Sequence, residues 1–175
     1  MKRLDDLAAA SAGTDATMAR RIGVFAPHGL LETIYSAAIH LGKYDVAADA
    51  ARRHDSLPLG QASDPELHEA LRQVELARAL VGQGKRVEVQ ATLEPTLAML
   101  RGRVSTGTAT LSLRQGCAEA LYAAALAQGD DPAGRATRRR LLDEASALLA
   151  GVSAEARQLR SLRQLSDEIA AARDS

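Results

Sequence analysis

Aromatic side chains are almost absent from this chain. They make up 2% of its 175 residues, and tryptophan is missing altogether. Stacking on nucleic-acid bases and caging of organic cations both depend on aromatic rings, so the chain has almost no surface for either. Hydrophobic residues nevertheless reach 46%. A core built from Ala, Leu and Val lets helix backbones approach closely, and the chain is long enough to bury one.

The chain also lacks an excess of either charge and any long apolar run. Lys and Arg together number 22, as do Asp and Glu. Nucleic acids and anionic membranes attract proteins through an excess of basic charge, so the balance argues against both partners. No apolar run approaches the roughly 20 residues that cross a bilayer. The first residues lack the apolar segment of a signal peptide, so we expect a cytoplasmic protein.

Residues that could carry chemistry are few and dispersed. Cys117 is the one cysteine, which excludes an internal disulfide and fits a reducing compartment. Its apolar neighbours predict a buried helical thiol. No two histidines stand at metal-ligand spacing; the four are His28, His40, His54 and His68.

Two basic segments have simple structural interpretations. The segment 82–86 is similar to part of a phosphate-binding loop, but Arg86 stands where Ser or Thr must hold a magnesium ion. The run 138–140 consists of three arginines with acidic residues around it, which predicts a solvated helix face. We therefore expect a protein that is not an enzyme and has no metal and no cofactor.

Apolar residues recur at helical spacing along most of the chain, which predicts an all-α fold. We expect helices over 28–41, 44–54 and 109–127. Another long helix begins after Asp64, which can cap it, with Pro65 in its first turn. These helices leave wide apolar surfaces, so each must be covered by its neighbours.

The segment 87–100 admits two interpretations. Its first residues alternate with a period of two, which would fit a strand, whereas Val89, Leu93 and Leu97 fit a helix. The helical context favours the helix. Pro95 then lies inside it and must kink it or split it at Glu94.

The C-terminal part predicts a helix that ends at Gly151 and a last helix capped by Ser153. Apolar side chains are expected along one stripe of the last helix: Leu159, Leu162, Leu165, Ile169 and Ala172. The opposite side is charged. One apolar face and one charged face suit a terminal helix that closes a stack.

Three turns divide the chain into units of similar length. Gly42, Gly84 and Gly129 recur 42 and 45 residues apart, a spacing typical of stacked helix pairs. Gly42 can adopt the left-handed conformation that ends a helix, and Tyr44 is large enough to wedge between the two helices it separates.

We expect the domain plan to follow these turns. Short N-terminal helices occupy 1–25 and a repeat domain occupies 26–173. The expected subdivisions of that domain are pairs near 27–56, 64–102 and 108–150, followed by a terminal helix over 154–173.

The segment Gly42-Lys43-Tyr44-Asp45-Val46-Ala47 resembles the Gly-x-Tyr-x-x-Ala turn of a tetratricopeptide (TPR) repeat. The second and third units keep the glycine but lose the tyrosine, and the repeat is longer than that family's 34 residues. The resemblance implies a TPR-like α-solenoid, a right-handed superhelical stack of antiparallel helix pairs with about seven to nine helices. The last two helices look like the C-terminal end of large bacterial signalling proteins, such as serine/threonine kinases and transcriptional regulators.

In the TPR family, peptides lie in a groove lined by the first helix of each pair. The resemblance places the following residues of this chain there: Glu32, Ser36, His40, Val74, Arg78, Val81 and Glu119. The alternative is that these are ordinary packed or solvated positions.

The function that the resemblance implies is a non-enzymatic scaffold that binds a peptide or protein partner. One alternative is a regulatory or dimerising tail of a larger signalling protein, which would associate with itself or with a catalytic head. Another is an enzyme or a small-ligand binder with a pocket between helices, for which a buried cluster of Glu32, His40 and Arg78 around a cavity would be the evidence.

Overall fold

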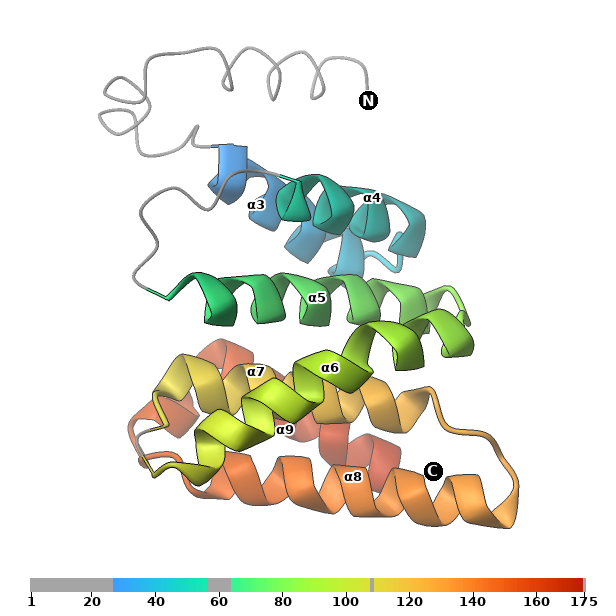
Figure 1. Cartoon of the computed structure of the whole chain (residues 1–175), viewed down its shortest axis with the longest axis vertical. Coiled ribbons are helices and arrows are strands. Elements are labelled where there is room, and N and C mark those ends of the chain that lie inside the picture. Colours follow the sequence, from blue (N-terminus) through green and yellow to red (C-terminus); the bar gives the residue numbers. More distant parts are fainter. Residues whose placement is uncertain (1–26, 57–63, 108, 175) are drawn as a thin grey trace.

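The computed structural model describes residues 27–56, 64–107 and 109–174 (Figure 1). Within these ranges the chain forms seven α-helices and one short 3₁₀ helix, with no strand, so the predicted all-α class is confirmed there. The helices predicted over 1–25 lie outside the described residues.

The helices follow one another with short connections. Their bounds are α3 Pro27–His40, α4 Tyr44–Asp55, α5 Pro65–Gly82, α6 Arg86–Ser105, α7 Leu111–Leu126, α8 Pro132–Ala150, η1 Ala156–Gln158 and α9 Arg160–Arg173. Figure 1 shows them arranged along the long axis of the molecule, with α3 and α4 at one end and α8 at the other.

Local side-chain and backbone chemistry sets the helix ends. The Asp64 carboxylate accepts a hydrogen bond from the amide of Leu67 at 3.1 Å, and the helix starts at Pro65 as predicted. Gly42 and Gly84 end α3 and α5 with φ of 65° and 72°, values that favour glycine. Gly129 also lies in a turn, between α7 and α8, but without a positive φ.

The start of the last helix differs from the prediction. Ser153 accepts a hydrogen bond from the amide of Ala156 at 3.2 Å, so its side chain contacts the start of the short helix η1 and does not cap α9. The last helix begins only at Arg160. Leu159 precedes it in extended conformation and is 49% exposed, so its place in the apolar stripe was wrong.

Helix α6 settles the choice between strand and helix for 87–100. It is one helix that runs through Pro95, so the predicted split at Glu94 does not occur. Val89, Leu93 and Leu97 are buried along its inner side. Pro95 removes the amide partner of the Ala91 carbonyl, but both residues are exposed, so water can reach that carbonyl.

Two hydrophobic clusters hold the helices together. The larger is rich in leucine and joins α5 to α9, and the smaller is built mainly from Ala38, Ala47, Ala48 and Ala79. Each helix packs on the next one in the chain, and α7 also contacts both α5 and α9. Since α5 has neighbours on more than one side, its wide apolar arc is explained.

Tyr44 connects α4 to the following helix. We expected its ring between α3 and α4, but the close contact is with Gly82 in α5. A Cβ atom on that glycine would lie 2.2 Å from the Tyr44 ring carbon Cδ1. The Gln83 side chain also donates a hydrogen bond to the Tyr44 carbonyl oxygen at 3.1 Å. Tyr44 therefore fixes the α3–α4 hairpin against α5.

Candidate functional site

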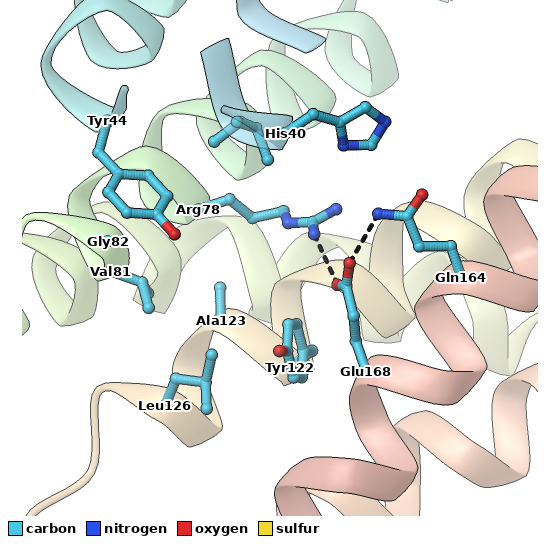
Figure 2. Close-up of a pocket in the computed structure, with 11 residues that line it drawn as sticks. His40, Tyr44, Arg78, Val81, Gly82, Tyr122, Ala123, Leu126, Gln164 and Glu168 are labelled. Carbon is cyan, nitrogen blue, oxygen red and sulfur yellow. Dashed lines mark hydrogen bonds and ion pairs between the residues drawn. The ribbon is translucent and has the colours of Figure 1, made fainter. Parts of the chain in front are cut away.

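The groove is a hollow between α3, α5, α7 and α9 that consists of two adjoining cavities of about 390 Å³ each. The first also reaches Tyr44 of α4, and the second reaches Tyr35 and Ser36 of α3. Both cavities are lined by Ile39, His40, Arg78, Gln164 and Glu168. Figure 2 shows Arg78 extending into the first cavity toward Glu168, with Tyr44 and Tyr122 on either side.

Arg78 joins three helices at the centre of the groove. Its Nη2 atom donates a hydrogen bond to Glu168 Oε2 of α9 at 2.8 Å, and its Nη1 atom lies 3.9 Å from Glu119 Oε2 of α7. The guanidinium carbon is 6.0 Å from the centre of the Tyr122 ring. The side chain of Arg78 is 20% exposed, so these contacts are only partly screened by water.

Each of the two carboxylates is oriented by a glutamine on its own helix. Gln115 Nε2 donates to Glu119 Oε1, and Gln164 Nε2 donates to Glu168 Oε1, both at 2.9 Å. In both cases the glutamine lies four residues earlier, one helical turn away. The two carboxylates are therefore held in place even though each also faces the groove.

Burial dominates the electrostatics of this cluster. It raises the pKa of Glu119, and the attraction of Arg78 opposes that rise only in part. Burial disfavours the charge on Arg78 as well, but the attraction of Glu119 and other neighbours outweighs it and raises the Arg78 pKa. Burial also raises the pKa of Tyr35. The site thus retains charged groups against a desolvation cost.

The Tyr35 hydroxyl has no hydrogen-bond partner among the described residues, although it is buried. Its side chain lines the same cavity as Glu119. A buried polar group without a partner is costly, and such groups are rare in folded proteins. The Tyr35 hydroxyl could therefore form a hydrogen bond with a ligand in the groove.

The structure brings four of the predicted groove residues together with Arg78. His40 lines both cavities, Val81 the first, and Ser36 and Glu119 the second. The prediction that Val74 lines the groove was wrong, because Val74 is 1% exposed in the core and cannot contact a partner. Glu32 is exposed but lines neither cavity, so the cluster of Glu32, His40 and Arg78 does not form.

Several groove residues were missed, above all Gln164 and Glu168 of α9. They stand outside the apolar stripe of the last helix, on the side that the sequence predicts to be charged. Gln-x-x-x-Glu occurs at 115–119 and at 164–168, but also at 90–94, where both residues are exposed on α6, so this spacing alone does not identify groove residues. Arg138 lies outside the groove, and its exposure also differs from the prediction of a solvated helix face. It is half-buried and donates hydrogen bonds to the Gln128 carbonyl at 3.1 Å and to Asp130 at 3.0 Å, so the run 138–140 is not wholly solvated.

Comparison of the chain with protein-family models, curated proteins and solved structures found no match. The function must therefore be argued from the chemistry of the groove. Cys117 offers no nucleophile there, because it is 1% exposed in the core and burial raises its pKa to about 11.

The described residues hold neither the clustered ligands of a metal site nor a membrane-spanning helix. Within those ranges, His, Cys, Asp and Glu nowhere gather in a group of three or more that could hold a metal ion. None of the described helices has both the length and the apolarity needed to cross a bilayer.

Proposed function

We propose that this chain is a TPR-like helical repeat module that binds a peptide segment of a protein partner in the groove and is not an enzyme. The observation that carries the proposal is the groove itself, which continues along α3, α5, α7 and α9. These are alternate helices of the chain, the ones that the TPR resemblance assigns to a peptide groove. The contacts of α7 with both α5 and α9 support the same arrangement.

The lining of the groove suits a peptide. Its lining includes apolar side chains such as Ile39 and Val81 and polar groups such as His40 and Gln164. Apolar surface supplies binding free energy, while a few oriented polar groups supply specificity. Two cavities that share one wall can accept two neighbouring side chains of an extended or helical segment.

The alternative of a dimerising tail has less support. Its best observation is a set of large apolar side chains that are exposed, namely Leu41, Val87 and Leu159 at 72%, 80% and 49%. They belong to three separate segments of the chain, and single exposed apolar residues are common on soluble proteins. The groove is the better-supported site.

The proposal can be tested by selecting random dodecapeptides from a display library on the full chain. Affinities of the selected peptides are then measured by fluorescence anisotropy. Ser36 is exposed and lines the groove, so Ser36→Trp should weaken binding about tenfold or more by filling the second cavity. Ser112→Trp, at an exposed position in α7, is the matched control and should bind normally. Equal binding by both variants would place the peptide site elsewhere.

A further inference from the structure

The groove holds more buried negative charge than positive charge. Arg78 is the cation between two carboxylates, Glu119 and Glu168. The side chains of the two carboxylates are only 20% and 26% exposed. Arg160 also lines the second cavity but is exposed at the start of α9, where water screens its charge. The partly buried cluster of one arginine and two glutamates thus has one more carboxylate than cation.

A third carboxylate adds to this imbalance from the side of α5. Glu75 repels the charge on Glu119 and contributes to the raised pKa of that group. Its own partner is His54, whose Nδ1 lies 3.1 Å from Glu75 Oε2. The field at Glu119 therefore favours the arrival of a cation.

The hydrogen bonds show where that cation would bind. Both oxygens of Glu168 already accept short hydrogen bonds, from Arg78 and Gln164. Glu119 Oε1 accepts one from Gln115. Glu119 Oε2 lies 3.9 Å from Arg78 Nη1, and this distance is too long for a hydrogen bond. It lines the same cavity as the buried Tyr35 hydroxyl, which has no partner in the described part of the chain.

We propose that the second cavity is a subsite for a cationic N–H group, the side chain of a Lys or Arg in the bound peptide, held by Glu119 Oε2 and the Tyr35 hydroxyl oxygen. The proposal rests on the peptide-binding function above and names the class of peptide. An ammonium or guanidinium group donates to both oxygens and neutralises the excess charge.

The rest of the cavity fits the same occupant. Ile39 is partly buried in the wall of this cavity and can pack against the methylene stem of a long basic side chain. Arg78 stays bound to Glu168 and need not move. A peptide carboxylate at this point would face Glu119 and Glu168 at short range, so the subsite also rejects acidic sequences.

The test uses the full chain and four pools of acetylated, amidated dodecapeptides. All positions are random except a central residue, which is Lys, Arg, norleucine or Glu. Norleucine keeps the apolar stem and removes the charge. We expect the Lys and Arg pools to bind about tenfold more tightly than the norleucine pool, since a charge-assisted hydrogen bond in a partly buried site has that effect. We expect the Glu pool to bind most weakly.

Variants locate the preference. Glu119→Gln should reduce the ratio between the Lys and norleucine pools to about one, and Tyr35→Phe should reduce it in part. Glu144→Gln is the matched control, because Glu144 pairs with Arg101 outside the groove and should leave the ratio unchanged. Equal binding of the Lys and norleucine pools, tightest binding of the Glu pool, or a ratio that survives Glu119→Gln would overturn the subsite.

A small probe separates this inference from the proposed function. Titration with n-butylammonium, followed by amide chemical shifts, should perturb residues around Glu119 in the native chain but not in Glu119→Gln, and butyrate should not perturb them. If no peptide pool binds while n-butylammonium does, the peptide function fails and the cation subsite stands. If all pools bind equally and Ser36→Trp abolishes binding, the groove stands and the subsite fails.

Discussion

The molecule contains two arginine–glutamate systems that join helices, and they differ in almost every physical respect. Arg101 of α6 grips Glu144 of α8 with two hydrogen bonds of 2.7 and 2.6 Å, and both side chains are more than a third exposed. Arg78 is shared between Glu119 and Glu168 in the groove, is half as exposed, and makes one short hydrogen bond.

The two systems are expected to differ in how they affect the stability of the fold. The outer pair has good geometry, but water and salt weaken it, so its contribution to stability is small. The groove cluster has poorer hydrogen-bond geometry and one more carboxylate than cation. Its side chains are also less exposed to water, and in such a place a charged atom without a partner lowers the free energy of unfolding. Under the proposed function, the groove cluster serves peptide binding and the outer pair serves the fold.

The largest expected effect comes from removing the two arginines. Arg78→Met leaves two partly buried carboxylates without their cation and should lower the free energy of unfolding by about 2–4 kcal/mol. Arg101→Met should lower it by only about 0–1 kcal/mol, because its partner returns to water. Urea denaturation of both variants measures the difference. Equal losses would show that the two systems do the same work.

The glycines on the two sides offer a sharper test of packing. Gly82 lines the groove, and a Cβ there would meet the Tyr44 ring at 2.2 Å, so Gly82→Ala should cost about 1–3 kcal/mol. Gly102 of α6 has nothing within 4 Å of the same position. Gly102→Ala should therefore stabilise the helix by about 0.5–1 kcal/mol. In both thermal and urea unfolding, Gly82→Ala should be less stable than the native chain and Gly102→Ala more stable. A change in the same direction for both variants would refute the Tyr44 contact.

Removing the Tyr35 hydroxyl tests whether the groove sacrifices stability. Tyr35→Phe deletes a buried group that has no partner in the described structure, so the variant should be more stable by about 1 kcal/mol. Tyr122→Phe is the control, since the Tyr122 hydroxyl is not stranded in this way. A loss of stability in Tyr35→Phe would mean that the hydroxyl is already satisfied in solution.

The smallest effect is a pH dependence. Burial raises the pKa of Glu119, so the folded chain binds a proton there more readily than the unfolded chain does. The charged form therefore costs stability at neutral pH, and this cost disappears as the pH falls through the raised pKa. Glu119→Gln should have a higher Tm than the native chain at pH 7, and the gap should narrow toward pH 4. A gap that widens on acidification would contradict the assignment.

Local signals predicted much of the helical architecture. Asp64 with Pro65, and the positive φ values at Gly42 and Gly84, depend only on nearby backbone, so the sequence suffices to place them. The groove was half predicted. Arg78 and Glu119 were named, and Val74 lies one helical turn before Arg78 on the same face of α5, but neighbouring helices cover that turn and bury Val74 in the core.

By itself, the sequence determined where most of the helices start, turn and stop, and that their apolar faces must be covered by neighbours. Those outcomes follow from interactions within a few residues. Only the tertiary structure decided that Glu168 of the last helix would meet Arg78, that Tyr44 would press on Gly82, and that one Glu119 oxygen would stay without a short hydrogen bond. Such contacts depend on how whole helices pack against one another. The spacing of residues along the chain does not specify the distance between side chains on different helices.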